Sequence, residues 1–356
     1  MQHVLIGVIV ASTVTRAKGG GMAATRADVA RMANVSPALV SYVLNDGPRP
    51  VSAEARARIE RAIQELDYRP NSIAQALRGA STRTIGLLLP SAVNRFFGEL
   101  ATAIEEALFA TGNTLAVGIS ADDPARETRY IETFVDRRVD GIMVISSHSL
   151  QTLTRLAEVN TPVMVLDRVP DRLPVSSVAV DNRAGVTAAV EHLFQHGHTA
   201  VACIGGRVGT ESADERVLAW RELVTPVASD PDALLARADF TEDGGYAAMR
   251  ELLERAGGEP PTALFVSSDI QASGAFRACA DLGVRVPGDL AVASFDGALS
   301  TAYAVPSITS YRQPVDRIAH TAVDGLLAQI ATPSRLPTHT VLPGELVVRC
   351  SCGCPA

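Results

Sequence analysis

The sequence contains no continuous apolar run of the roughly 18 residues that a membrane-spanning helix needs. That absence excludes a helical membrane protein. A hydrophobic fraction of 47% with 20% charged residues is typical of a soluble globular chain. Because one hydrophobic core seldom extends beyond about 300 residues, the length of 356 residues predicts two or three domains.

Catalytic signatures are absent as well. The sequence has no G-x-G-x-x-G, P-loop, H-E-x-x-H or G-x-S-x-G pattern, so the common nucleotide, zinc-protease and serine-hydrolase sites lack support. We expect a protein that is not an enzyme, with no catalytic residue and no cofactor. A sugar hydrolase or kinase is the enzymatic alternative.

Cysteine is rare, with five residues, of which three form CSCGC at positions 350–354. An odd count outside a small disulfide-bonded domain is typical of a reducing compartment, and we predict a cytoplasmic protein. His192 and His196 stand four residues apart on a predicted helix, but no third metal ligand is evident from the sequence. Because CSCGC does not have zinc-finger spacing, no metal site is predicted, and residues 350–356 are expected to form a flexible tail.

Basic residues are concentrated near the N-terminus of an acidic chain. The formal net charge is −7, yet residues 23–83 carry nine Arg against six Asp and Glu, and the 273 residues after them carry a charge of −12. A small basic segment on a large acidic body indicates a nucleic-acid-binding part. Residues 1–22 are expected to be a tail, or to reflect a start assigned too early, with initiation at Met22.

Residues 23–69 are predicted to form a headpiece of three short helices. Thr25 opens a capping box, and Ser36 followed by Pro37 is a typical helix start. Ser52 caps the third helix. Two short helices joined by a tight turn have the layout of a helix-turn-helix, although this spacing leaves a purely structural three-helix bundle open.

Residues 70–82 are predicted to be a hinge. A helix of about eight residues is unstable alone in water, so we expect this segment to become helical when it is paired across a dimer. Leu77 would then be wedged into the minor groove of DNA. A plain linker is the alternative.

From Thr84 onward, eight β-rich runs alternate with helices, beginning with TIGLLLP and ending with LAVASFD. Continuous apolar strands separated by helices predict parallel sheets covered on both faces. The predicted fold class is therefore α/β, with an N-terminal all-α helix-turn-helix headpiece and two doubly wound parallel-sheet subdomains in residues 83–349. A closed (β/α)₈ barrel is the alternative.

Several segments in order carry a family resemblance, among them TRADVARMANVSPALVSYVLN, RRVDGIMVIS, VDNRAGVTAAVEHLFQHGH and GVRVPGDLAVASFDG. Over residues 24–349 the sequence resembles the lactose-repressor/galactose-repressor family of bacterial transcription regulators. The resemblance implies a homodimer whose two headpieces bind a palindromic double-stranded DNA operator. It also implies an effector-binding and dimerisation domain like a periplasmic sugar-binding protein.

The resemblance implies which residues contact DNA. The first residues of the recognition helix choose the bases in this family, and here they are Pro37 and Ala38, with Tyr42 one turn later. These residues depart from the lactose-repressor pattern of a larger polar pair and an Arg, so we expect a different operator. The predicted DNA-binding residues are Thr25, Ser36, Pro37, Ala38, Ser41, Tyr42, Asn45, Asn71, Ala74 and Leu77.

The effector is expected in a cleft between the two subdomains, where the strands end and the chain crosses over. Carboxylates and guanidinium groups can hydrogen-bond to sugar hydroxyls, and an aromatic face can cover the C–H surface of a sugar. The residues that match family ligand positions are Phe96, Phe97, Asp167, Arg168, Arg216, Trp220, Ser268, Asp269 and Asp296.

Arg216 and Asp296 are the strongest of these candidates. Trp220 and Phe97 have a second interpretation as core residues, and Asp269 has one as a helix cap. Ser268 stands where the lactose repressor has Asn, which leaves a purine or another small effector open.

We therefore predict a ligand-responsive transcriptional regulator, expected to repress carbohydrate-metabolism genes, with a sugar as the expected effector. Ligand binding would shift the subdomain arrangement and thereby the spacing of the paired hinges. The competing hypothesis is a sugar-binding protein for transport or scavenging, without a DNA role. No leucine-rich heptad tail follows the last strand, so we expect no tetramer through such a tail.

Overall fold

The computed structural model describes residues 24–44, 50–68, 81–146, 161–168, 174–257 and 260–355. Internal contacts divide the chain into two units, Met1–Ala80 and Ser81–Ala356. Four predicted DNA-binding residues lie outside the described residues: Asn45, Asn71, Ala74 and Leu77. Residues 1–22 lie outside them as well.

The first unit contains α1 (Arg26–Met32), α2 (Pro37–Leu44) and α3 (Ala53–Glu65). The capping box is present, because the Thr25 side chain accepts from the Asp28 N–H and Asp28 accepts from the Thr25 N–H. Asn34 has a φ of 52°, the left-handed conformation that the turn between α1 and α2 needs. The three helices enclose a small core that includes Val29, Ala30, Val40, Ile59, Ala62 and Tyr68.

Ser81 and Thr82, the last two residues of the predicted hinge segment, pack on the second unit. The Thr82 N–H donates to Asp140 Oδ1 at 2.9 Å, and the Ser81 hydroxyl donates to Asp140 Oδ2 at 2.5 Å. Asp140 thus holds the last two residues of the predicted hinge at the start of the second unit.

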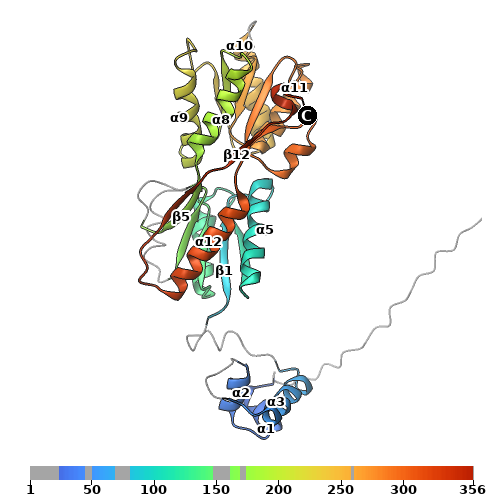
Figure 1. Cartoon of the computed structure of the whole chain (residues 1–356), viewed down its shortest axis with the longest axis vertical. Coiled ribbons are helices and arrows are strands. Elements are labelled where there is room, and N and C mark those ends of the chain that lie inside the picture. The colour runs from blue at the N-terminus through green and yellow to red at the C-terminus, as the bar shows by residue number, and fades with distance from the viewer. Residues whose placement is uncertain are drawn as a thin grey trace, which may run out of the picture. The chain divides into compact units, whose positions relative to one another are not determined.

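The second unit consists of two six-stranded sheets covered by helices, as Figure 1 shows. The strand orders are β11-β5-β4-β3-β1-β2 and β12-β10-β9-β8-β6-β7, and the only antiparallel pair among the described strands is β10 with β12. The fold is thus the predicted pair of doubly wound sheets. Two open sheets with separate edges rule out the closed barrel.

The N-terminal subdomain is built around the first sheet. Its elements are β1 (Thr84–Leu89), α5 (Arg95–Ala110), β2 (Thr114–Ile119), α6 (Pro124–Asp136), β3 (Gly141–Val144), β4 (Val163–Leu166), β5 (Ser176–Val180), α12 (Val315–Ala331) and β11 (His339–Leu342). Helices α5 and α12 pack side by side on one face and share a core with the strands (Figure 1).

The C-terminal subdomain is built around the second sheet. Its elements are α8 (Asn182–Gln195), β6 (Val201–Gly205), α9 (Glu211–Val224), β7 (Leu235–Arg237), α10 (Glu242–Ala256), β8 (Ala263–Val266), α11 (Asp269–Asp281), β9 (Ala291–Asp296), η1 (Leu299–Tyr303), β10 (Thr309–Arg312), β12 (Glu345–Val347) and η2 (Cys350–Cys352). The chain crosses between the subdomains after β5, after β10 and after β11.

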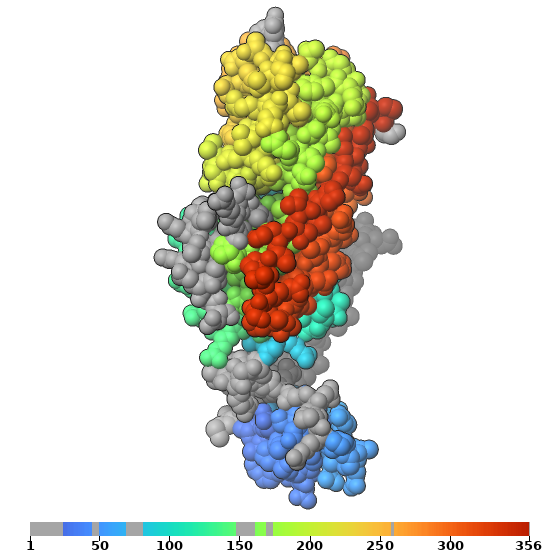
Figure 2. Space-filling view, turned by 60° about the vertical axis from the view of Figure 1, so that its left-hand side comes forward, coloured from blue at the N-terminus to red at the C-terminus, as the bar shows by residue number. Residues whose placement is uncertain are grey.

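The C-terminal segment is packed against the protein, which corrects the prediction of a flexible tail at residues 350–356. Ser351 is fully buried, and its hydroxyl donates to the Val292 carbonyl at 2.7 Å and accepts from the Thr309 N–H at 2.8 Å. Because these contacts join the segment to β9 and β10, residues 350–355 belong to the C-terminal subdomain. In Figure 2 this red segment lies against the green surface that includes α8. No helix among the described residues is long and apolar enough to cross a membrane.

Candidate effector and DNA-binding sites

A narrow cavity lies between the two subdomains at the carboxyl ends of their strands. Its volume is about 10 Å³, close to the room that one water molecule needs. Side chains from both subdomains therefore contact one another across the cleft. The lining residues are Asn94, Phe96, Phe97, Asp167, Arg168, Ser212, Arg216, Phe240, Ser268 and Asp296.

Arg216 is the central cation of this cavity. It lies on α9 and is only 3% exposed, and its guanidinium donates to Asn182 Oδ1 at 2.8 Å and to the Ser267 carbonyl at 2.7 Å. It lies 3.4 Å from Asp296 Oδ1 and 3.9 Å from Asp167 Oδ1. The guanidinium also stacks 3.8 Å from the ring centroid of Phe295. These contacts hold Arg216 in one orientation between two carboxylates, one from each subdomain.

Both carboxylates lie where a parallel strand ends. Asp167 follows β4 with a φ of 61°, and Asp296 ends β9 with a φ of 105°. Such a conformation is rare for an L-residue and is typical of functional sites. Burial raises the pKa of Asp296, against the opposing effect of Arg216, and the nearby Asp269 and Asp167 carboxylates raise it further.

Arg168 supplies the second cation. It is 2% exposed and donates to Asp122 Oδ1 at 2.6 Å, while its guanidinium lies 5.8 Å from the ring centroids of Phe97 and Phe240. Among the described residues, Arg168 Nε and Asp167 Oδ1 have no hydrogen-bond partner although both are buried. Buried polar atoms normally find partners, so these two atoms are available to a polar ligand.

Seven of the nine predicted effector residues line the cavity, and two do not. Trp220 is fully buried, its indole N–H donates to the Val201 carbonyl at 2.9 Å, and it packs in the core behind β6. Asp269 accepts from the Ser310 hydroxyl and the Ala298 N–H, both at 2.7 Å. Both assignments as cavity residues are corrected: Trp220 is a core residue, and Asp269 ties α11 to β10 and to the loop after β9.

Three cavity residues were missed by sequence reasoning. Asn94 caps α5 through a hydrogen bond from the Phe96 N–H at 3.1 Å, Ser212 lies in the first turn of α9, and Phe240 follows β7. Asn94 stands where polar residues commonly cap helices, whereas Ser212 lies two residues after Thr210, the N-cap of α9. What identifies them as cavity residues is the tertiary fold, which brings these helix starts to the ends of the strands.

The stability of the second unit should depend on the protonation of Glu127, which is fully buried on α6. Burial raises the pKa of Glu127 to about 7, against the hydrogen bond that it accepts from Ser146. An unfolded Glu titrates near 4.3, so the folded state binds more protons between these values and loses stability as pH rises through them. We expect the decrease in unfolding free energy between pH 5 and pH 8 to be smaller in Glu127→Gln by about 1 to 2 kcal/mol.

Urea unfolding at a series of pH values measures this difference. The matched control is Glu132→Gln, which removes an exposed carboxylate from the same helix. Equal pH profiles for Glu127→Gln and the wild type would contradict the prediction.

The headpiece presents the other candidate site on α2. Ser36, Pro37 and Ala38 are exposed at its start, and Ser41 and Tyr42 are half-buried one turn later. Ser36 Oγ accepts from the Leu39 N–H at 3.3 Å, and Arg58 Nε donates to the Ala33 carbonyl at 3.1 Å. The first bond caps α2, and the second joins α3 to the end of α1. α2 itself packs on both helices through buried Val40, which leaves its N-terminal face open, as a helix that enters a DNA groove requires.

Comparisons with known proteins match two separate parts of the chain. Residues 25–71 match the model described as "Bacterial regulatory proteins, lacI family", and residues 190–352 match a periplasmic binding protein-like domain. The HTH-type transcriptional repressor PurR of Aliivibrio fischeri is 32% identical over 332 residues, which cover 92% of this chain and 98% of that protein. The chain belongs to the LacI family.

Two further similarities support this membership. The ribose operon repressor of Escherichia coli K12 is 32% identical over 314 residues, or 87% of this chain and 94% of that repressor. A structure of the lac repressor dimer bound to operator and the anti-inducer ONPF has a TM-score of 0.83 at 28% identity, covering 93% of this chain and 99% of that chain.

This LacI-family chain is a transcriptional regulator with a DNA-binding helix-turn-helix and an effector-binding domain. The hypothesis of a binding protein without a DNA role is not favoured, because its relatives are repressors over nearly their whole length. Proteins of this family regulate transcription, and nothing in the comparisons indicates catalysis.

Proposed function

We propose that this regulator binds a palindromic operator as a homodimer and that its operator affinity is controlled by a sugar, which binds between the subdomains when the cleft opens beyond its present cavity of about 10 Å³. The main observation in support is that the Arg216 guanidinium lies between Asp167 and Asp296, which come from the two subdomains. A sugar hydroxyl can accept from Arg216 and donate to a carboxylate at the same time. A ligand that makes such bonds to both subdomains changes their relative preference for open and closed arrangements.

The chemistry of the cavity favours a sugar over a purine. Two carboxylates and two guanidinium groups line it, which suits a ligand with many hydroxyl groups more than a flat base with few polar edges. Phe97 and Phe240 lie near Arg168 and can cover the apolar side of a sugar ring. The relatives include both a ribose operon repressor and PurR, so both ligand classes belong in the test.

Exposed apolar side chains support the homodimer. Val93 and Phe109 are 74% and 73% exposed at the two ends of α5, and Tyr303 and Val305 are 86% and 94% exposed in and after η1. Apolar side chains exposed this far are available on both subdomains for contact with a second protein. A second copy of the chain is the partner that this surface supports, as in the lac repressor dimer to which the chain is similar.

We propose that the start of α2 contacts the DNA bases through Pro37 and Ala38, with Tyr42 one turn later. The exposure of the first two residues and the packing of α2 on the headpiece core support this assignment. Apolar and aromatic contacts discriminate bases chiefly through the thymine methyl group and base shape. The preferred operator should therefore differ from one that is read by a long polar pair.

A thermal-shift screen of purified protein against monosaccharides and purine bases tests the effector class. A ligand that binds only the folded state raises the unfolding temperature, and we expect this from a monosaccharide. The same compound should change the affinity for an operator selected from random palindromic DNA. Stabilisation by a purine base alone, with a matching change in operator affinity, would contradict the sugar.

A further inference from the structure

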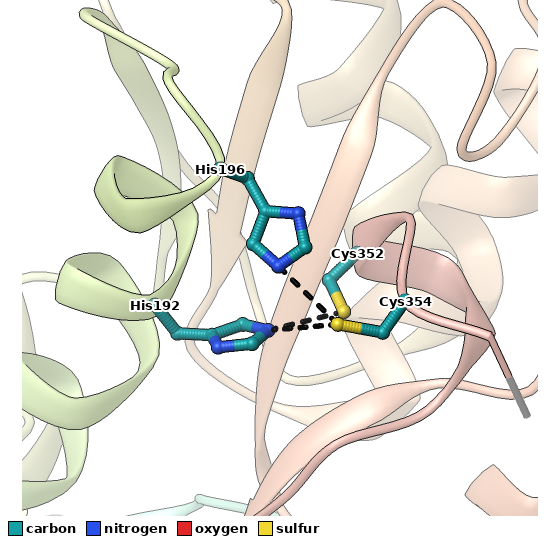
Figure 3. A group of neighbouring side chains, drawn as sticks. All are labelled: His192, His196, Cys352 and Cys354. Carbon is teal, nitrogen blue, oxygen red and sulfur yellow. Dashed lines mark hydrogen bonds between the residues drawn. The ribbon is translucent and has the colours of Figure 1, made fainter.

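A cluster of four potential metal ligands lies at the far end of α8 from the cleft. His192 in the last turn of α8 and His196 at its C-cap point toward Cys352 and Cys354 from the C-terminal segment, as Figure 3 shows. One ligand atom from each residue lies within 4.8 Å of the other three. Neither the histidine pair nor CSCGC is a complete ligand set by itself, and 160 residues separate His192 from Cys352 in the sequence.

We propose that His192, His196, Cys352 and Cys354 form a tetrahedral site for a thiophilic metal ion such as Zn²⁺. His192 Nε2 lies 3.2 Å from Cys352 Sγ and 3.8 Å from Cys354 Sγ, and His196 Nε2 lies 3.2 Å from Cys354 Sγ. A zinc ion with Zn–N distances near 2.0 Å and Zn–S distances near 2.3 Å holds such atoms about 3.3 to 3.8 Å apart. The four atoms therefore need only small shifts to coordinate one ion.

The backbone holds these ligands in position before any ion binds. Gly353 turns the chain between the two cysteines with a φ of 95°, a left-handed conformation that favours glycine. Buried Ser351 anchors the same turn to β9 and β10. The rings of His192 and His196 meet edge to face with centroids 4.7 Å apart. Little conformational entropy remains to be lost on metal binding.

Neighbouring groups can support a bound thiolate. The Thr309 hydroxyl lies 3.1 Å from Cys352 Sγ, close enough to donate a hydrogen bond to it, and it accepts from the Arg349 N–H at 2.8 Å. Cys352 Sγ also lies 3.2 Å from the Arg349 carbonyl, to which its thiol proton can be donated. On metal binding this proton is released to solvent, and Thr309 becomes the donor to the sulfur.

The net charge of the metal-bound site is compatible with its partial burial. Two thiolates balance the two charges of Zn²⁺, and two neutral imidazoles complete the tetrahedron, so the loaded site has no net charge. Cys352 is 1% exposed and His192 is half-buried, whereas His196 is exposed. A neutral complex at this depth avoids most of the cost of burying an isolated charge. The ion would cross-link the C-terminal segment to α8.

Metal titration of the full-length protein under reducing conditions tests this site. Chelator-stripped protein should bind one Co²⁺ per chain, with a thiolate-to-cobalt absorption band and the intense visible bands of tetrahedral Co²⁺. Zn²⁺ should displace the Co²⁺ and raise the unfolding temperature. Binding of much less than one ion per chain would overturn the proposal, and so would a Cys352–Cys354 disulfide that persists under the reducing conditions.

Two variants make the test specific. His196→Ala and Cys354→Ser remove ligands near the surface, so neither opens a core cavity, and each should lower Zn²⁺ affinity by at least about 100-fold. Cys350→Ser is the matched control, since Cys350 belongs to the same CSCGC segment but not to the cluster, and it should bind as the wild type does. Stoichiometric binding that survives both ligand substitutions would assign the ion to another place and overturn this site.

Discussion

Arg216→Gln is expected to lower effector affinity by at least about 100-fold, or about 2.8 kcal/mol. The substitution removes the positive charge that lies between Asp167 and Asp296 and the donors to Asn182 Oδ1 and the Ser267 carbonyl. Asp167 and Asp296 would then lose the cation between them, and a bound sugar would lose its strongest donor. Calorimetry with the compound found by the screen measures the loss.

Two further variants separate charge from geometry. Arg216→Lys keeps the charge but loses the planar fork, so its affinity should fall less, by about tenfold. Arg221→Gln is the control, because Arg221 lies on the same helix and pairs with Asp232 at the surface. Operator binding without effector should persist in all three. An Arg216→Gln protein that binds the compound with normal affinity would remove Arg216 from the site.

Ala38→Glu is expected to weaken operator binding by at least about 100-fold without changing effector affinity. Ala38 is exposed at the start of α2, and a carboxylate there would approach the phosphates and bases of the duplex. Fluorescence anisotropy with the selected operator, at one fixed salt concentration, measures the change.

The control for Ala38→Glu is a carboxylate placed elsewhere on the headpiece. Ala57 is exposed on α3, so Ala57→Glu adds the same charge outside the proposed DNA-facing surface. Its effect on operator affinity should stay below about tenfold, because the added charge would lie farther from the DNA and its electrostatic interaction with the DNA would be weaker. Equal losses in the two variants would indicate a general charge effect and contradict the assignment of α2.

The parts of the fold that the sequence predicted are those with a strong local signal. β1, β3 and β4 are continuous apolar runs, and Thr25 caps its helix as its capping-box pattern indicates. The four strands that were missed are short or polar: β7, β10, β11 and β12. β10 reads Thr-Ser-Tyr-Arg, and its buried Ser310 is satisfied only by Asp269 and the Gly297 N–H, which come from distant parts of the chain.

The site residues also differ in how far the sequence identifies them. Asp167 and Asp296 were predicted from the family resemblance and both line the cavity, whereas Phe240 follows a strand of three residues that carries no pattern. Trp220 and Asp269 match family positions in sequence, but their polar atoms are used by Val201 and by Ser310. A sequence does not reveal which partners a buried polar group finds, because those partners are set by the tertiary fold.

The three crossings between the subdomains limit how the effector domain can move. Connections at Asp181, Gln313 and Gly344 join the same two sheets, so sliding one subdomain past the other would stretch at least one of them. Rotation about the line of the crossings is compatible with all three connections. β1 begins at Thr84, only three residues after the second unit starts. A rotation of the N-terminal subdomain would therefore reach the covalent connection with the first unit through only a short stretch of chain.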